Sequence, residues 1–145
     1  MFSQTAEYAL RAMSALAARS PSSMTTGEIA GVTRVPPAYL SKVLQALRKA
    51  GLVKSLRGIG GGVSLAEDLD EITVLEIINA VDPIRRINEC PIGLAAHGVQ
   101  LCPMHSRLDS ALAMVEEVFR ETTLAELLAE QSGRGQACKF PKLKK

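Results

Sequence analysis

Two cysteines and a histidine lie close together in the second half of the chain, within ECPIGLAAHGVQLCPMH, residues 89–105. Cys90 and Cys102 are twelve positions apart, and His105 follows three residues after the second cysteine. Thiolate and imidazole groups are ligands of zinc and of iron–sulfur centres, and two thiols can also form a reversible disulfide. The residues alone leave three interpretations open: a metal centre, a redox-switched thiol pair, or an inert loop.

The composition is that of a compact helical protein. The chain of 145 residues has room for one domain, or one domain with an added arm, and 47% of its residues are apolar. We find no apolar run of the roughly 18 residues that a membrane span needs, and the N-terminus lacks the pattern of a secretory signal. We therefore expect a cytoplasmic protein without a membrane partner, in which three cysteines favour metal or redox chemistry over a structural disulfide.

Charge is divided unevenly along the chain. Residues 1–66 contain eight Lys and Arg against two acidic residues, a net charge of +6. Residues 67–145 contain nine Lys and Arg against thirteen acidic residues, a net charge of −4. The basic half favours a polyanion as partner, although an ordinary charged surface can have the same composition.

The order of predicted elements in the basic half is that of a winged helix-turn-helix domain. A capping box at Thr25–Glu28 starts the second helix, and Gly51 ends the third in a left-handed cap. The apolar period then changes from that of a helix to that of a hairpin. The predicted elements are helices over residues 3–19, 25–31 and 38–50, followed by strands over residues 52–56 and 62–66.

The acidic half is predicted to contain three more helices. A capping box at Thr73–Glu76 opens the first, which stops at Asp82 before a proline. The cysteine segment that follows is rich in Pro and Gly and is typical of a loop. A long helix is predicted from about residue 103 to 121, and a third capping box at Thr123–Glu126 starts a short helix to about residue 131. The apolar stripe of the long helix consists of Leu108, Leu112, Val115 and Phe119.

The third helix carries the candidates for base contacts. The N-terminal part of the second helix of a helix-turn-helix reaches base edges in the major groove. Tyr39, Ser41, Lys42 and Gln45 face outward there, whereas Arg48 and Lys49 suit phosphate contacts, although most such faces are merely solvated. The full set of candidate DNA-binding residues is Thr26, Ala38, Tyr39, Ser41, Lys42, Gln45, Arg48, Lys49, Arg57, Gly58 and Gly60.

The predicted hairpin has a glycine-rich tip. Four of the five residues 58–62 are Gly and follow Arg57, so the backbone can approach a polyanion closely. A Walker loop would need Gly-Lys-Ser/Thr before a helix, and Val63 stands where a dinucleotide motif needs its last glycine. The loop is therefore not expected to bind nucleotides. The chain also lacks a Ser/His/Asp or paired-carboxylate arrangement at reactive spacing, so we do not expect an enzyme. Two alternatives stay open: a zinc hydrolase that uses Cys90, Cys102 and His105, and an architectural DNA binder that senses nothing.

Three motifs in the chain resemble the Rrf2 family of bacterial winged-helix transcription regulators: EYALRAM, LSKVLQALRKAGLVKSLRGIGGGVSLA and ITVLEIINAVD. The resemblance spans roughly residues 1–130 and implies a homodimer, held by the long helix, that binds a pseudo-palindromic double-stranded operator, most simply as a repressor. The apolar stripe independently favours a second copy as partner. The implied division is a winged helix-turn-helix domain (1–82), a sensor loop (83–103), dimerisation helices (104–131) and a disordered basic tail (132–145).

The same resemblance gives the cysteine segment a cofactor. Relatives that hold an iron–sulfur cluster carry three cysteines here, often followed by a histidine, and this chain has Ala96 at the middle position. Because one thiolate is missing, the resemblance implies a [2Fe–2S] cluster with mixed ligands that senses redox state, nitric oxide or iron–sulfur status. A cluster-free regulator, switched by a disulfide or controlled by a partner, is the alternative. The implied metal ligands are Cys90, Cys102 and His105, with Glu7 and His97 competing for the fourth place.

Overall fold

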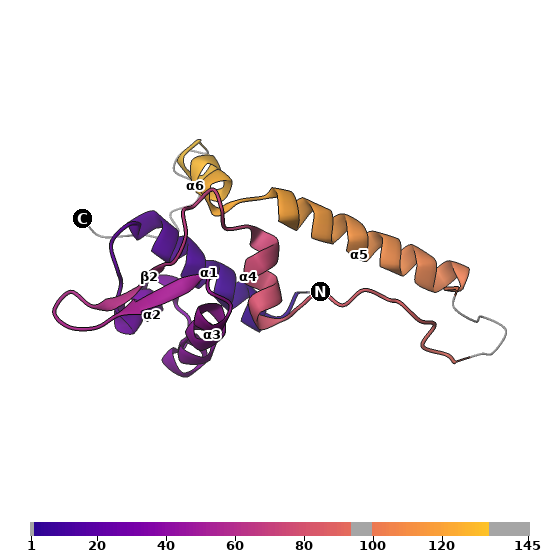
Figure 1. The fold of residues 1–145 in the computed structure, drawn as a ribbon, viewed down its shortest axis with the longest axis horizontal. Helices are drawn as coiled ribbons and strands as arrows, with labels where there is room; N and C mark the ends of the chain where they lie inside the picture. Colours follow the sequence, from indigo (N-terminus) through magenta and orange to yellow (C-terminus); the bar gives the residue numbers. More distant parts are fainter. Residues whose placement is uncertain (1, 94–99, 134–145) are drawn as a thin grey trace.

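The computed structural model describes residues 2–93 and 100–133. These residues form a mainly helical protein with a small antiparallel hairpin, which confirms the expected winged helix-turn-helix with a long C-terminal helix (Figure 1). The elements in chain order are α1 (Gln4–Arg19), α2 (Thr26–Thr33), α3 (Pro37–Lys49), β1 (Val53–Leu56), β2 (Gly62–Leu65), α4 (Val74–Val81), α5 (Pro103–Glu121) and α6 (Leu124–Gly133).

Helix α1 lies at the centre of the domain and packs against α2, α3, α4 and α6. Its small residues are buried on several sides, and Met13 and Leu16 fill the core between them. Leu124, the first residue of α6, is buried in the same core. Helix α6 therefore packs with the winged domain, although it directly follows the long helix.

The capping boxes predicted from sequence set the start of α2, α4 and α6. At α2, the Thr25 hydroxyl accepts from the N–H of Glu28 at 3.2 Å, and the Glu28 carboxylate accepts from the N–H of Thr25 at 2.8 Å. The equivalent pairs are formed by Thr73 with Glu76 and by Thr123 with Glu126. Each helix begins where its two exchanged bonds satisfy free backbone donors.

The end of α3 directs the chain into the hairpin. Gly51 has φ +81°, its N–H donates to the carbonyl of Arg48 at 3.0 Å, and the N–H of Leu52 donates to the carbonyl of Leu47 at 3.0 Å. This pair of bonds is the Schellman arrangement, which favours glycine at the left-handed position. The predicted left-handed cap at Gly51 is confirmed.

The hairpin, which we call the wing, consists of β1, the loop 57–61 and β2. The strands are antiparallel, with Val53 opposite Leu65 and Leu56 opposite Gly62. Met24 pairs with Val63 of β2 through two backbone hydrogen bonds of 2.8 and 2.7 Å. This pairing attaches the wing to the segment that precedes α2.

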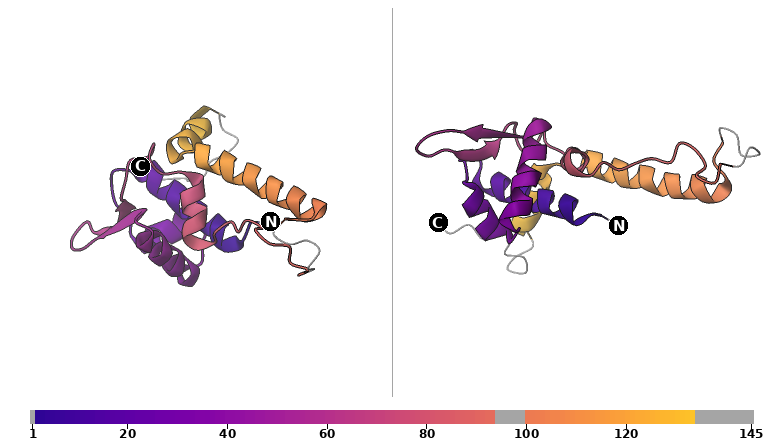
Figure 2. Two further views of the ribbon diagram at one scale, coloured as in Figure 1. Left: turned by 45° about the vertical axis from the view of Figure 1, so that its right-hand side comes forward. Right: turned by 90° about the horizontal axis from the view of Figure 1, so that it is seen from below.

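Helix α5 extends away from the domain, on the side opposite the wing (Figures 1 and 2). Its C-terminal end is tied back to α4, because the N–H of Val74 donates to the carbonyl of Thr122 at 2.9 Å. Helix α6 runs to Gly133, and residues 134–145 of the predicted tail lie outside the described residues. None of the described helices combines the length and apolar character needed to cross a membrane.

Candidate metal centre and DNA-reading surface

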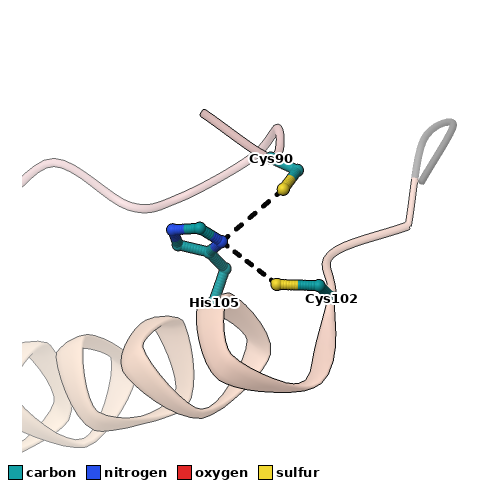
Figure 3. A group of neighbouring side chains, drawn as sticks. All are labelled: Cys90, Cys102 and His105. Atoms are coloured by element: carbon teal, nitrogen blue, oxygen red, sulfur yellow. Dashed lines mark hydrogen bonds between the residues drawn. The ribbon is translucent and has the colours of Figure 1, made fainter. Parts of the chain in front are cut away.

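Cys90, Cys102 and His105 converge on one point near the N-terminus of α5 (Figure 3). The Nδ1 atom of His105 lies 3.2 Å from the Sγ atom of Cys102 and 3.6 Å from the Sγ atom of Cys90. All three potential ligand atoms lie within 4.8 Å of one another. The structure thus brings together the three residues that the sequence predicted as ligands.

The first turn of α5 positions two of these groups. Cys102 is the N-cap residue, with φ −64° and ψ 161°, and Pro103 occupies the first helical position, where its missing N–H costs nothing. His105 lies three residues after Cys102, so both side chains lie at the start of the helix on the same side. His105 is only 9% exposed, which restricts its ring to few orientations.

Cys90 comes from a segment that runs beside α5 and is fastened to it by an arginine. The Nε and Nη2 atoms of Arg86 donate to the two carboxylate oxygens of Asp109 at 2.7 and 2.6 Å, and Nη1 donates to Glu116 at 3.2 Å. The N–H of Ile87 donates to the same Asp109 at 2.9 Å. We call this arrangement the Arg86 clamp (Arg86, Ile87, Asp109 and Glu116).

The opposite charges of the clamp shift the pKa values of its side chains. The Arg86 guanidinium, and after it the N–H of Ile87, lower the pKa of Asp109 to about 2. The carboxylates of Asp109 and Glu116 raise the pKa of Arg86 above its ordinary value. Asp109 lies one helical turn after His105, and Arg86 lies four residues before Cys90. The clamp therefore holds the Cys90 segment in register with the turn that carries the other two candidate ligands.

The spacing of the three atoms suits metal coordination. Zinc–sulfur and zinc–nitrogen bonds of typical length place neighbouring ligand atoms of a tetrahedral ion about 3.6 Å apart. The measured distances from Nδ1 of His105 to the two sulfur atoms are 3.2 and 3.6 Å. Two thiolates and an imidazole are also a donor set that suits an iron–sulfur centre with mixed ligands. The described residues of one chain provide three ligands, so either kind of centre takes its fourth from elsewhere.

Neither candidate for the fourth ligand belongs to this group in the described part of one chain. Glu7 is exposed in the first turn of α1, where its Oε1 atom accepts from Nε of Arg11 at 2.7 Å. His97 lies outside the described residues. Both remain predictions.

The face of α3 predicted to read DNA is open to solvent. Its apolar residues point into the core, and the seven outward candidates from Ala38 to Lys49 are exposed. Tyr39 also packs edge-on against Tyr8 of α1, with ring centres 6.1 Å apart, so its ring is held rather than free. The inward residues are Leu40, Val43, Leu44 and Leu47, as the period predicted.

A hollow of about 180 Å³, lined by both polar and apolar side chains, lies between α2, α3 and the wing. Thr26, Ser41 and Gln45 line it together with Arg48, whose Nη1 atom donates to the Ser55 hydroxyl at 3.2 Å. Thr26, predicted as a DNA contact, therefore lines the same hollow as Ser41 and Gln45 of the predicted reading face of α3. The remaining candidates, Arg57, Gly58 and Gly60, are exposed in the loop of the wing.

An apolar groove of about 590 Å³ lies between α1, α4, α5 and the segment after α4. Leu108, Leu112 and Val115 of the predicted stripe line one side of it, whereas Phe119 packs against Phe2 with ring centres 5.3 Å apart. Leu108 remains 51% exposed and Met114, on the same helix, 71% exposed. Helix α5 therefore presents much apolar surface that one chain leaves uncovered.

Comparison with known proteins gives the family. The family model Rrf2, described as an iron-dependent transcriptional regulator, matches residues 2–130. The chain belongs to the Rrf2 family. A helix-turn-helix transcriptional regulator of Aquifex aeolicus is 31% identical over 131 residues, which cover 88% of this chain and 91% of that protein.

Solved structures of two other Rrf2 regulators resemble this one. IscR of T. potens matches with a TM-score of 0.78 and 27% identity, covering 95% of this chain and 93% of that one. CymR of B. subtilis, described as its global cysteine regulator, matches with a TM-score of 0.74 and 29% identity, covering 90% and 97%. This Rrf2 protein is accordingly a DNA-binding transcription regulator and not an enzyme.

Sequence reasoning missed the Arg86 clamp. Arg86 and Asp109 are 23 positions apart, and charged residues are common on such surfaces. The spacing of Asp109, four residues after His105, was a signal that it shares a helix face with a ligand. Its arginine partner could be recognised only once the fold had brought the segment beside α5.

Proposed function

We propose that this chain is a homodimeric transcription repressor whose hold on a pseudo-palindromic operator is controlled by an iron–sulfur centre at Cys90, Cys102 and His105. The observation that carries the proposal is the convergence of these three side chains within 4.8 Å. The description of the matching family as iron-dependent and the likeness to IscR support it. A repressor of this kind acts on chromosomal DNA, hence in the cytoplasm.

In this proposal two thiolates and one imidazole hold the centre. When bound, an iron–sulfur centre supplies a group that responds to oxidants and to nitric oxide. A [2Fe–2S] form is favoured because the described residues bring two cysteines to the site, and imidazole or carboxylate must then replace the missing thiolates. The fourth ligand is then Glu7 of a second copy or His97 of the same chain.

The position of the ligands supports a coupling between sensing and DNA binding. Cys90 continues the segment that leaves α4 of the winged domain, whereas Cys102 and His105 begin the long helix α5. Release of Cys90 from His105 removes one contact between this segment and α5, beside the Arg86 clamp, and so loosens the segment at its Cys90 end. Because operator half-sites are about 34–36 Å apart, a shift of a few ångströms between two reading helices changes affinity.

The dimer is proposed on the apolar surface of α5. Leu108 and Leu112 line the groove of about 590 Å³, and a second copy related by a two-fold axis would cover both grooves at once. An exposed apolar helix face of this kind is unusual on a monomer.

The test is anaerobic purification of the full chain. We expect coloured protein with iron and acid-labile sulfide in near-equal amounts, and faster operator release after nitric oxide or peroxide. Cys90→Ala should remove the colour while leaving a folded dimer by circular dichroism and gel filtration. A colourless, iron-free preparation of the wild-type chain under these conditions would contradict the proposal.

A thiol switch is the second candidate, since the two sulfur atoms lie within 4.8 Å of each other. The likeness to CymR, a cysteine regulator in B. subtilis, gives it further support. In that case the iron-free protein should lose two mass units on mild oxidation and release its operator, and dithiothreitol should restore binding. Oxidation that leaves operator affinity unchanged would exclude this candidate.

A further inference from the structure

The tip of the wing carries an apolar side chain with no role in the fold. Ile59 is fully exposed, with a relative accessibility of 110%. It stands between Gly58 and Gly60, in a loop whose other residues are Arg57 and Gly61. An exposed Ile contributes nothing to core burial, so its side chain is available for a contact outside the chain.

The loop around Ile59 is a defined turn. The N–H of Gly61 donates to the carbonyl of Gly58 at 3.0 Å, and Gly60 has φ +77°. These features are those of a type II turn with Ile59 at its first corner position. A Cβ atom on Gly61 would lie 2.5 Å from the carbonyl oxygen of Leu56, so the turn closes tightly only with glycine there.

Two contacts fix this turn to the body of the domain. The Ser23 hydroxyl donates to the carbonyl of Gly60 at 2.9 Å. A Cβ atom on Gly62 would lie 2.5 Å from the carbonyl oxygen of Met24, so the strand approaches that segment backbone to backbone. The glycines of the wing thus allow its tight turn, and this fixed turn places the Ile59 side chain outward, towards solvent.

The surroundings of Ile59 favour nucleic acid over a protein partner. Arg57 and Lys54 lie in the same hairpin, and the half of the chain that contains it has a net charge of +6. Leu56 is the other large apolar side chain exposed on the described wing, too little for a protein docking patch. Proteins that enter the minor groove often insert a single Ile, Leu or Phe against a base step, flanked by basic residues.

We propose that Ile59 enters the minor groove beside each half-site and presses against a base step, partly unstacking it. The branched side chain has few rotamers to lose, so the insertion carries a small entropic cost. Such a contact would favour flexible A·T-containing steps at positions that α3 does not touch. This inference rests on the proposed operator binding and adds a second reading element to it.

The test begins with duplexes that the wild-type dimer selects from a random library. Affinities of wild type, Ile59→Ala and Ile59→Ser are then measured by fluorescence anisotropy, with Arg57→Ala as the matched control. We expect Ile59→Ala to bind about tenfold more weakly with an unchanged salt slope, because it removes apolar contact only. Arg57→Ala should instead reduce the salt slope by about one.

A second measurement reports on the base step itself. A 2-aminopurine placed at successive flanking positions should brighten on binding of the wild type at one step, and not on binding of Ile59→Ala. Affinity of Ile59→Ala within twofold of wild type, together with unchanged 2-aminopurine fluorescence, would overturn the inference while leaving operator binding intact. If the wild type selects no sequence at all, the proposed function fails and the inference fails with it.

Discussion

His105 is the most constrained of the three candidate ligands, because its ring is buried and its Nδ1 atom faces both sulfur atoms. We expect His105→Ala to abolish the visible absorption of anaerobic protein, since two thiolates alone do not complete a cluster. Met104→Ala, at an exposed position of the same turn, is the control and should keep the colour. Equal iron content in both variants would count against the imidazole as a ligand.

The lowered pKa of Asp109 leads to a prediction about stability in acid. Its pKa is lowered to about 2 by Arg86 and the N–H of Ile87, below the value of about 3.9 for an unfolded chain. A lowered pKa contributes stability that is fully present above about pH 4 and is lost as the pH falls towards 2. In urea unfolding of metal-free protein, the free energy of unfolding should therefore fall less between pH 5 and pH 3 for Asp109→Asn than for wild type.

The control for that measurement is Glu117→Gln. Glu117 pairs with Arg120 on the exposed side of the same helix, and exposed ion pairs of this kind contribute little to stability. A variant at this position should follow the wild-type pH profile. If Asp109→Asn and wild type show the same profile, the clamp does not stabilise the protein in solution.

At the residue scale, the sequence was most informative where spacing alone fixes geometry. Cys102 and His105 share a helical turn because they are three residues apart, and this could be predicted. The approach of Cys90 could not be derived from spacing, because it depends on how the segment after α4 lies along α5. The resemblance to cluster-bearing relatives supplied that expectation instead.

Among the elements, the segment between α4 and α5 depends on the Arg86 clamp for its position. Arg86→Gln should keep all three candidate ligands but loosen the segment that carries Cys90. The cluster should then decay several-fold faster in air, as measured by the loss of its visible absorbance. Arg85→Gln, which changes the neighbouring exposed arginine, should decay at the wild-type rate. Equal decay of both variants would show that the clamp does not position Cys90.

The capping box of α2 allows a stability prediction. Thr25→Ala removes the acceptor for the N–H of Glu28, and such a change typically costs about 1 kcal/mol. The reciprocal bond, from the N–H of Thr25 to the Glu28 carboxylate at 2.8 Å, lowers the pKa of Glu28. Chemical denaturation should show this loss for Thr25→Ala, whereas Lys42→Ala should weaken DNA binding with unchanged stability.

The elements themselves were predictable because their signals are local. Capping boxes, the Pro at the start of α3 and α5, and Gly51 each act within a few residues of one another. The position of α6 was not predictable in this way. Leu124 returns to a core formed mostly by the winged domain, and the bonds that guide it there join Ile72 and Leu69 to residues more than fifty positions away.

For the whole molecule, the uncovered face of α5 predicts dimerisation. Leu108→Glu should shift the protein towards monomer in analytical ultracentrifugation and weaken operator binding, because a charge replaces apolar surface in the groove. Arg107→Glu, a neighbouring exposed position, is the control and should leave the dimer intact. A monomeric wild type would refute the proposed assembly.

Helix α5 is attached to the winged domain at both of its ends. Its C-terminal end is joined through the bond between Val74 and Thr122, and its N-terminal end through Cys90 and the clamped segment that returns to α4. Because both ends are attached, helix α5 cannot rotate about one attachment without straining the other. Breaking the contact between Cys90 and His105 leaves the Arg86 clamp in place at this end, so a chemical event at one residue weakens one of the two attachments of the whole helix.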